Sequence, residues 1–557
     1  MASDNLGDYE RVQEEGKYSL EADIPTITFT EIGKRGIRRM DGYEKASGKA
    51  IYTRDIQLPG MLYGRVLMSP YARAKILRMD TGRAEALPGV RSIMRYDDPE
   101  IEGRGLNGSY FAPGWVGRQL KRSGLVEDEL EGWGLKPVRP VLGDEAWYEG
   151  QPVGVAVAAD SEDIANEALR LVDMDWEELP FVLDQEEALK PDAPILRPNS
   201  DSNLLEDPRQ LLEVGDVEKG FKEADRIIEF TARRNAHLWA GAEMASVLVR
   251  WRGDNLEMWL REQQPYHAKM LFAEWMDLPM NRITVHSPYM GCSFGERGNP
   301  ANNPSNGMNI LAALFSKRTG RPVKFLYNRN ETFFGESGDM MVSYFKVGAK
   351  EDGTITAVQI KNVFAVYMCT PGIEHFIDNT RIPNLKCEAI TVDVSKAAAW
   401  WDRCEQLPNT FCFTLVFDHV AAELGMDPTE VALKNDGYDS RDTTHLSKYK
   451  SEHGFPDRDS LKECIEAGKK AIGWDEKWHP PGTKKLPNGK MHGMAFTWDH
   501  AWDDVRGTGS AAILIENDGT VSIIGQQADI GVNPWTAYCQ IVADELGMRY
   551  QDINIKP

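Results

Sequence analysis

The sequence predicts an α/β (α+β) fold, because strand-like and helix-like segments alternate along most of its 557 residues. Short apolar runs of strand length alternate with helices between residues 48 and 182. A strand–turn–helix–strand unit then occurs twice, over residues 255–285 and 521–555, and a glycine-rich turn at 291–298 follows the first copy. A chain of this length is long enough for about three or four domains.

The composition is typical of a globular protein and excludes two classes of partner. Hydrophobic residues make up 42% of the chain and charged residues 27%. The net charge of −22 opposes binding to nucleic acid and to anionic lipid. The N-terminus has no basic and apolar leader, and no apolar stretch approaches about 18 residues. We therefore expect a cytoplasmic protein without nucleic-acid or membrane partners.

The cysteines predict neither a zinc knuckle nor an iron–sulfur site on this chain, because no two of them form a C-x-x-C pair. They stand at Cys292, Cys369, Cys387, Cys404, Cys412, Cys464 and Cys539. We expect buried thiols in a reducing compartment. Any iron–sulfur cluster that the protein uses would then lie on another chain.

The first third of the chain predicts an arm, an α/β region and a linker. Residues 1–37 are polar and poorly patterned, which indicates an arm lying on a partner or on the following domain. Asp160 is a predicted helix N-cap, because acidic residues and then an apolar stripe follow it. This helix is expected to pack on a strand at 153–158. Four prolines with several Asp and Asn residues indicate a linker over 187–212.

The first copy of the repeated unit begins with a strand at 255–259. The turn Gln263-Gln264-Pro265 leads into a helix with apolar residues at helical spacing between 268 and 275, and a strand at 283–285 closes the unit. Gln263 stands at the entry of this helix, where a helix cap is one interpretation of it.

The second copy has the same order of elements. A strand at 521–524 is followed by a turn in which Asn533 and Pro534 suit the N-cap and first helical positions. A helix over 535–546 and a strand at 553–555 complete the unit. The two segments are therefore expected to form one supersecondary motif used twice.

A glycine-rich turn follows only the first copy. Glycine lacks Cβ and permits positive φ, so the turn at 291–298 could direct backbone N–H groups at phosphate or oxo oxygens, or be a tight structural turn. No such turn follows the second copy, and an unpaired strand edge is normally concealed. We expect a separate polypeptide to continue the fold; the alternative is a plain C-terminus on an edge strand.

Several motifs in the first third of the chain resemble one known domain. They are Gly48-Lys-Ala-Ile-Tyr-Thr-Arg-Asp55, Leu58-Pro-Gly-Met-Leu-Tyr-Gly64, Ser69-Pro-Tyr-Ala72, Gly150-Gln-Pro-Val153 and Trp176-Glu-Glu-Leu-Pro180. Together they resemble the α/β hammerhead domain in the molybdenum-binding subunits of the xanthine dehydrogenase and aldehyde oxidase family.

Motifs farther along the chain resemble the active-site segments of the same family. Gln263 is similar to a glutamine that hydrogen-bonds an oxo ligand of molybdenum. Gly291 to Gly295 resembles a G-G-G-F-G turn whose backbone at Phe294 faces the metal. An Arg381-Ile-Pro-Asn segment followed by Arg403 has the family's spacing for an active-site arginine, and residues 427–435 resemble its D-P-x-x-x-R-x-K-N signature.

The resemblance implies a domain order. Residues 1–37 would form the arm, 38–186 the hammerhead domain and 187–212 the linker. The first molybdopterin-binding domain would occupy 213–440. Residues 441–557 would be the first part of a second such domain, which a partner chain completes.

The resemblance also implies a cofactor, partners and an activity. The cofactor would be a molybdenum–pterin, as molybdopterin or its cytosine dinucleotide form, shared with the chain that carries the second half of the domain. Iron–sulfur clusters and FAD would lie on other subunits, an iron–sulfur subunit and optionally a flavin subunit. The enzyme would hydroxylate a small aromatic, N-heterocyclic or aldehyde-like substrate with water as the oxygen donor.

The residue types suit this chemistry, because such a protein supplies hydrogen bonds to the cofactor and no metal ligands. The implied cofactor contacts are Gln263, Gly291, Ser293, Phe294, Gly295, Arg403 and Gly531. Arg403 would also stabilise charge that develops on the substrate. Without the resemblance, Arg403 would be interpreted as a surface ion pair.

Three departures from the family pattern bear on specificity and on the cofactor. Glu405 stands where the family has an aromatic residue, so it could accept hydrogen bonds from a substrate, hold a proton, or pair with Arg403. Gly531-Val532-Asn533 lacks the glutamine of a G-Q-G pterin contact. The family's general-base glutamate, which lies later in the usual subunit, has no counterpart here.

A cluster of acidic and aromatic residues at 498–504 permits two interpretations. Its members are Trp498, Asp499, His500, Trp502, Asp503 and Asp504. Histidine with carboxylates could bind a divalent cation, but a solvated or cofactor-facing loop is the simpler interpretation. Trp498 or Trp502 could replace the aromatic residue lost at Glu405.

The departures leave two further functions open. A hydratase, dehydratase or hydroxyl-transfer enzyme on the same scaffold would explain Glu405 and the altered turns. A non-catalytic scaffold subunit would explain Val532 and the missing base. Only a hydroxylase reduces an electron acceptor, and only a scaffold lacks molybdenum.

Overall fold

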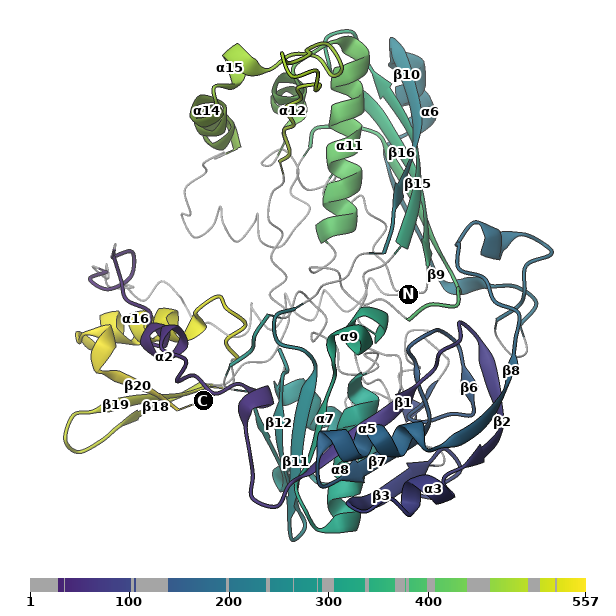
Figure 1. Ribbon diagram of the computed structural model, residues 1–557. Helices are drawn as coiled ribbons and strands as arrows, with labels where there is room; N and C mark the ends of the chain where they lie inside the picture. Colours follow the sequence, from purple (N-terminus) through teal and green to yellow (C-terminus); the bar gives the residue numbers. More distant parts are fainter. Residues whose placement is uncertain are drawn as a thin grey trace, which may run out of the picture. The chain divides into compact units, whose positions relative to one another are not determined.

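The computed structural model describes most of the chain, as two separate units. The described residues are 29–34, 36–101, 105–106, 139–196, 200–236, 241–263, 265–287, 289–292, 305–335, 340–365, 376, 380–397, 406–437, 461–498, 511–525 and 528–556. One unit, here called the terminal unit, combines Met1–Ile51 with Thr508–Pro557. The other, the main unit, comprises Tyr52–Gly507. Figure 1 labels their elements.

A seven-stranded sheet organises the first part of the main unit. Its order is β13-β12-β11-β14-β1-β7-β3. The strands are β1 (Leu62–Met68), β3 (Val90–Arg95), β7 (Pro152–Ala159), β11 (Ser246–Arg252), β12 (Asn255–Leu260), β13 (Ile283–His286) and β14 (Val323–Leu326). Parallel pairing of β1 with β14 joins strands of the predicted hammerhead segment to strands of the predicted molybdopterin-binding segment.

Helices pack on this sheet. They include α5 (Glu162–Arg170), α7 (Pro265–Trp275) and α8 (Ser305–Thr319). The short helix α9 (Arg329–Gly335) is linked to β1 by the ion pair between Glu331 and Arg65. The α5 helix contacts β1 and β7, as predicted. Its N-cap is Ser161, whose side chain accepts a hydrogen bond from the Ile164 N–H, so the prediction of Asp160 is wrong by one residue. The Asp160 carboxylate instead pairs with Arg91 and Arg321.

Gly64 of β1 makes room for the ring of Phe325 on β14. It lies opposite Phe325, and a Cβ at Gly64 would stand 2.0 Å from a ring carbon of Phe325, which is 1% exposed. A buried ring has no space into which it can move.

Gly64→Ala should therefore lower the free energy of unfolding by about 2 kcal/mol, the typical cost of overfilling a packed core. Gly468→Ala is the matched control, because Gly468 lies in a helix and nothing stands within 4 Å of its Cβ position. We expect that control to be neutral or stabilising. Denaturant unfolding of the two variants would test this, and equal midpoints would contradict it.

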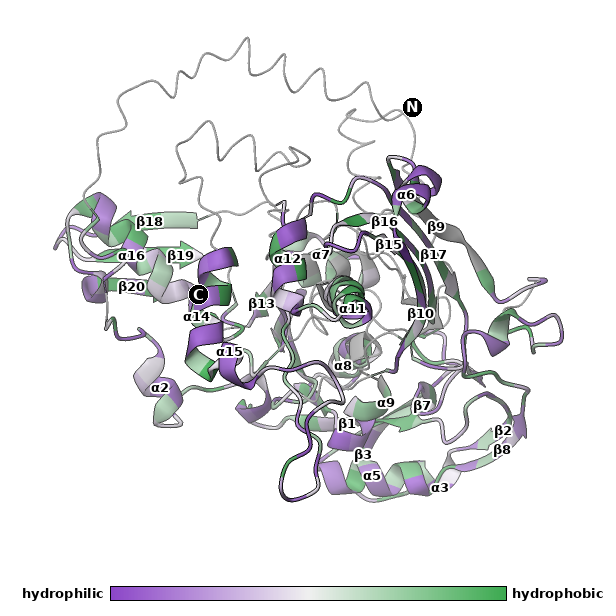
Figure 2. Cartoon of the chain, turned by 90° about the horizontal axis from the view of Figure 1, so that it is seen from above, coloured by the Kyte–Doolittle hydropathy of each residue, from purple (hydrophilic) through white to green (hydrophobic). Residues whose placement is uncertain are grey.

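A five-stranded sheet organises the second part of the main unit, in the order β10-β15-β16-β17-β9. Its strands are β9 (Leu204–Val214), β10 (Arg226–Arg234), β15 (Met340–Ala349), β16 (Ile355–Ala365) and β17 (Leu385–Val392). The apolar helix α11 (Gln406–Leu424) packs on β15 and β10. Figure 2 shows apolar residues along α11 beside these strands.

The predicted linker at 187–212 is wrong in its second half, because residues 204–212 belong to β9. This strand pairs antiparallel with β17 at the edge of the sheet. The pairing is irregular between Ala389 and Thr391, opposite the part of β9 that contains Pro208. An edge strand with a bulge tolerates a proline that a central strand would not.

Smaller elements complete the main unit. Its other strands are β2 (Ala74–Asp80), β4 (Gly105–Leu106), β5 (Arg139–Pro140), β6 (Glu145–Ala146) and β8 (Asp173–Glu178). Its other helices are η1 (Thr53–Asp55), α3 (Gly82–Glu85), η2 (Glu187–Leu189), α6 (Val217–Glu223), η3 (Met280–Arg282), α12 (Pro428–Asn435), α14 (Leu461–Ile472) and α15 (Trp474–Lys477). No helix in the described part of the chain is long and apolar enough to cross a membrane.

The terminal unit contains a three-stranded sheet in the order β18-β19-β20. Its elements are α2 (Gly42–Ala46), β18 (Ala511–Ile515), β19 (Val521–Gly525), α16 (Pro534–Leu546), η4 (Tyr550–Asp552) and β20 (Ile553–Lys556). Buried residues of α16 pack on this sheet: Cys539, Val542 and Ala543.

The predicted repeat is confirmed. Both copies run strand, strand, helix, 3₁₀ turn, strand: β11-β12-α7-η3-β13 in the main unit and β18-β19-α16-η4-β20 in the terminal unit. In each copy the first two strands are antiparallel and the last two parallel. Leu256 opposite Ile283 corresponds to Val521 opposite Ile553, which fixes the register between the copies.

The five described cysteines are free thiols. Cys387, Cys412 and Cys539 are buried as expected, whereas Cys464 is exposed on α14, so the prediction is wrong there. The amphipathic α14 buries Leu461 and Ile465 and turns its other side outward.

Candidate functional site

The carboxyl ends of the parallel strands β12 and β13 lie side by side, and Gln263 follows the first of them. The Ser287 hydroxyl, just after β13, donates to the Glu262 carbonyl at 2.9 Å and accepts from the Glu262 N–H at 3.3 Å. Gln263 is the next residue and is partly buried. Ligands of α/β sheets commonly bind outside the carboxyl ends of their strands.

The glycine-rich turn begins at the same strand ends. Gly291 lies four residues after Ser287, and its N–H donates to Oε2 of Glu243 at 2.8 Å. The Glu243 N–H donates back to the Gly291 carbonyl at 3.0 Å. A Cβ at Gly291 would stand 2.6 Å from the Cβ of Glu243, so only glycine permits this approach. Sequence reasoning missed Glu243, whose role depends on this contact.

These contacts give Gly291 a structural role. Its N–H donates to the Glu243 carboxylate, so this backbone donor is already satisfied within the protein. The segment before β11 that contains Glu243 is held by Arg329 of α9, which donates to the carbonyls of Gly241 and Ala242.

Cys292 continues the turn in a left-handed conformation. Its φ is +82°, in the region that glycine favours and other residues rarely adopt. Such a backbone costs about 1–2 kcal/mol for a residue with Cβ. Position 292 therefore has a backbone conformation that favours glycine, although a cysteine stands there.

The structure leaves several predicted site residues untested. Ser293, Phe294, Gly295, Arg403 and Glu405 lie outside the described residues. So do Asp499, His500, Trp502, Asp503 and Asp504 of the acidic cluster. What the structure does place is the start of α11 at Gln406, directly after Glu405.

Trp498 belongs to the core, which corrects one prediction. Its side chain is 6% exposed, and its ring packs edge-on against Phe413 and Phe417 of α11 at centroid distances of 4.7 and 5.2 Å. A ring enclosed in this way is not available to stack on a substrate. Trp498 therefore cannot replace the aromatic residue that Glu405 displaces.

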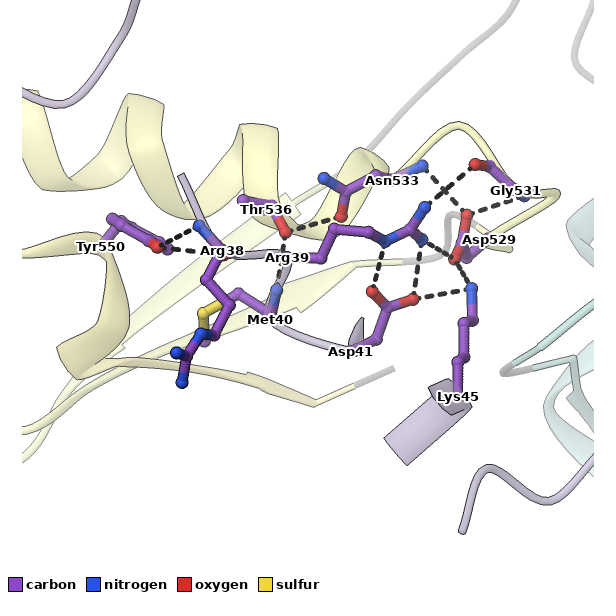
Figure 3. Close-up of polar contacts among 10 residues, drawn as sticks. All are labelled: Arg38, Arg39, Met40, Asp41, Lys45, Asp529, Gly531, Asn533, Thr536 and Tyr550. Atoms are coloured by element: carbon purple, nitrogen blue, oxygen red, sulfur yellow. Dashed lines mark hydrogen bonds and ion pairs between the residues drawn. The ribbon is translucent and has the colours of Figure 1, made fainter. Parts of the chain in front are cut away.

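In the terminal unit, the turn that contains Gly531 is built around one buried carboxylate (Figure 3). Oδ1 of Asp529 accepts hydrogen bonds from the N–H groups of Gly531 at 2.9 Å and Asn533 at 3.1 Å. Gly531 has φ +109° and Asn533 has φ +64°. The turn enters α16 as the Gln263 loop enters α7, so the repeat places Gln263 and Gly531 in corresponding connections.

Two cations from the N-terminal segment neutralise Asp529, which is 1% exposed. Arg39 donates to Oδ2 of Asp529 at 3.0 Å and to the Gly531 carbonyl at 3.2 Å, and Lys45 also pairs with this oxygen. Asp41 joins both cations, at 2.8 Å from Arg39 and 2.7 Å from Lys45. Although burial opposes its ionisation, these hydrogen bonds hold the pKa of Asp41 far below its ordinary value.

The N-terminal segment also lies along α16. The Asp544 carboxylate accepts from the N–H groups of Thr30, Glu31 and Ile32 at 2.7, 2.9 and 2.8 Å. Burial opposes the shift, but these three donors lower the pKa of Asp544 to about 2. The described part of the predicted arm, with residues 38–46 of the predicted hammerhead segment, thus contacts residues some 500 positions later, which sequence proximity could not indicate.

The donor types at the β12 and β13 ends fit a molybdenum–pterin group. They comprise a partly buried glutamine amide and a backbone with left-handed φ at Cys292, which are groups that can hydrogen-bond a cofactor without ligating its metal. The Asp529 turn engages the N–H groups of Gly531 and Asn533 internally, so Asp529 already satisfies these two donors.

Two families of domains match this chain. The molybdopterin cofactor-binding domain matches residues 198–436. The a/b hammerhead domain of aldehyde oxidase and xanthine dehydrogenase matches residues 47–114.

Curated relatives belong to the same group. The chain is 30% identical to a probable xanthine dehydrogenase subunit of Bacillus subtilis (strain 168) over 542 residues, 94% of this chain and 66% of the relative. It is 25% identical to the nicotinate dehydrogenase large molybdopterin subunit of Eubacterium barkeri over 419 residues, 73% of this chain and 89% of that protein. The chain thus spans slightly under two thirds of the Bacillus relative's length.

Solved structures share the fold. Quinoline 2-oxidoreductase from Pseudomonas putida 86 superposes with a TM-score of 0.72 at 19% identity, over 95% of this chain and 67% of that one. The aldehyde oxidoreductase from Desulfovibrio gigas superposes with a TM-score of 0.71 at 20% identity, over 93% of this chain and 55% of that one. With its hammerhead and molybdopterin-binding domains, the chain belongs to the xanthine dehydrogenase and aldehyde oxidase family.

Proposed function

We propose that this chain is the part of a molybdenum hydroxylase that binds one side of the molybdenum–pterin cofactor. The enzyme would hydroxylate an aromatic, N-heterocyclic or aldehyde-like substrate with water as the oxygen donor. The observation that supports this most is the position of Gln263 and the Gly291 turn after the neighbouring strands β12 and β13, where Ser287 bonds the Glu262 backbone and Glu243 bonds Gly291. The cofactor, when bound, supplies the two-electron redox chemistry.

The residues of this chain would orient the cofactor and stabilise charge on the substrate. Gln263 would direct its amide at the oxo side of the cofactor. The backbone from Cys292 to Gly295 would present N–H groups beside it, held in place by the Glu243 anchor. Arg403 would stabilise negative charge on the substrate, and Glu405 would accept hydrogen bonds from polar substituents on the substrate ring.

We propose a separate chain as the source of the second half of the molybdenum domain. The Eubacterium barkeri subunit supports this arrangement, because 89% of that separate subunit aligns with part of this chain. Electrons would leave through an iron–sulfur subunit and optionally a flavin subunit. The pterin would be molybdopterin or its cytosine dinucleotide form.

The native complex, purified through an affinity tag on this chain, provides the test. Metal analysis should find about one molybdenum for each copy of this chain. Turnover of candidate N-heterocycles in ¹⁸O-labelled water should label the product and reduce one two-electron acceptor for each product formed. A molybdenum-free complex would indicate a scaffold, and product without acceptor reduction would indicate a hydratase.

Arg403→Ala should lower turnover about 10²-fold, because a charged hydrogen bond to the transition state would be lost. Molybdenum content should not change, since the proposed role concerns the substrate. Arg381→Ala is the control, because Arg381 is an exposed arginine in the neighbouring Ile-Pro-Asn segment. Wild-type turnover in Arg403→Ala would show that Arg403 has no role in the active site.

A further inference from the structure

Two histidines close an exposed loop of the main unit, residues 479–492, here called the histidine loop. Nε2 of His479 and Nδ1 of His492 are 2.7 Å apart. Their ring centres are 5.0 Å apart, so both nitrogens lie between the rings and point at each other. This is the geometry of an N–H···N hydrogen bond, in which the two facing nitrogens share one hydrogen.

Little else holds the histidine loop closed. Every residue of 480–491 except Leu486 is exposed. Within the loop, the His492 N–H donates to the Lys484 carbonyl at 2.9 Å and the Leu486 N–H donates to the Lys490 carbonyl at 2.8 Å. A segment with few buried contacts opens easily, so the histidine pair can decide whether these backbone bonds persist.

The neighbouring carbonyl fixes where the hydrogens of the pair lie. Nδ1 of His479 is 2.9 Å from the Pro480 carbonyl oxygen, which can only accept, so this nitrogen carries a hydrogen. In the neutral pair, Nδ1 of His492 therefore donates to Nε2 of His479. One added proton reverses this bond, because Nε2 of His479 then donates and Nδ1 of His492 accepts. A second added proton puts hydrogens on both facing nitrogens, and the bond is lost.

The charges around the pair also oppose a second proton. Burial and the nearby Lys484 lower the pKa of His492 below its ordinary value. His479 and Lys477, which ends α15, act in the same direction. The sequence from 477 to 498 contains no Asp or Glu that could offset these cations.

The other charged groups nearby leave this balance unchanged. Lys485 and Lys490 of the loop add positive charge. On α15, Asp475 is paired with Lys469 of α14 at 3.0 Å, and Glu476 is exposed. Within the described part of the chain, no carboxylate acts on the pKa of His492.

We infer that the His479–His492 pair is a pH-sensitive clasp, which closes the histidine loop near neutral pH and releases it in mildly acidic solution. The direction follows from the number of protons bound. The closed pair takes up one added proton, whereas the two separated histidines of the open loop take up two. Closure is therefore strongest above the ordinary histidine pKa of about 6.5 and weakens as the pH falls below it.

The release should remain local, because fixed groups stand on both sides of the loop. Before it, the Trp474 indole N–H donates to Oδ2 of Asp427 at 2.8 Å. After it, the Trp498 ring packs against Phe413 and Phe417 of α11. Acid should therefore free the lysines of the histidine loop and leave the rest of the main unit folded.

Hydrogen exchange of the native complex, purified through a tag on the full chain, measures the closure. After correction for the intrinsic effect of pH on exchange, protection of the peptide covering 480–493 should fall about 30-fold between pH 7.5 and pH 5.0. One extra proton on a histidine of ordinary pKa favours the open loop by about this factor at pH 5.0. Peptides from β15 and β16 should keep their protection. Equal protection of the loop at both pH values would overturn the inference.

His492→Asn separates protonation from hydrogen bonding. The Asn amide can take the place of Nδ1 and can donate or accept, but it does not titrate, so the loop should stay closed at both pH values. His492→Ala lacks the bond and should already be open at pH 7.5. His286→Asn is the matched control, because His286 lies on β13 beside Glu257 and should not affect the response. A full pH response in His492→Asn, or its loss in His286→Asn, would show that another group drives the release.

Discussion

Asp529→Ala should lower the free energy of opening the terminal unit by about 3 kcal/mol, because Arg39 and Lys45 would keep Asp41 but lose the second of their two shared carboxylates. Arg39 and Lys45 would lose this partner, and the N–H groups of Gly531 and Asn533 would lose their acceptor. The turn and the N-terminal segment are held by the same side chain, so both should be released together.

Hydrogen exchange followed by mass spectrometry measures this opening locally, which suits a chain with two units. Peptides from 29–51 and 528–556 should exchange about 10²-fold faster in Asp529→Ala, because about 1.4 kcal/mol corresponds to a factor of ten. Peptides of the main unit should not change. Unchanged exchange in both terminal peptides would show that Asp529 does not hold the turn.

Asp529→Asn separates the two roles of this residue. Its amide oxygen can still accept from Gly531 and Asn533, but the charge that pairs with Arg39 and Lys45 is gone. We expect an intermediate opening, with the turn at 529–533 protected more than the segment at 39–45. Equal effects of the Ala and Asn variants on both segments would assign the whole stabilisation to the ion pairs.

Gly291→Ala should abolish most activity of the complex. The new Cβ would stand 2.6 Å from the Cβ of Glu243, so the turn must move by about 1 Å and break its two contacts with that residue. A displacement of about 1 Å near a reacting centre can cost about 10²-fold in rate. Some complexes should also lose molybdenum because the turn is displaced. The two effects together should lower the turnover for each complex roughly 10³-fold.

Cys292→Gly in the same turn is the matched control. It removes a side chain from a residue with φ +82°, so it should relieve strain and keep the path of the backbone. Molybdenum content and turnover should stay near those of the wild type. Metal analysis and steady-state kinetics on both complexes would decide, and full molybdenum content in Gly291→Ala would show that the turn tolerates Cβ.

Local patterning in the sequence was sufficient to predict the α/β class and the repeated unit. The apolar spacing and the helix-start residues Pro265, Asn533 and Pro534 are short-range features. The structure confirms both copies of the repeated unit that they predict. Errors arose where tertiary contacts override a local signal. Pro208 suggested a linker, yet the edge of the sheet accommodates it in β9.

The family motifs alone determined which residues are candidates for chemistry: Gln263, the turn from Gly291, Arg403 and Glu405. Only the tertiary structure decided that the Gly291 N–H donates to Glu243, that Trp498 fills the core, and that Asp529 pairs with Arg39 and Lys45. These assignments depend on contacts between residues 48 to about 490 positions apart. Local pattern cannot encode such contacts, because each partner alone is an ordinary polar or aromatic residue until the folded backbone brings the two together.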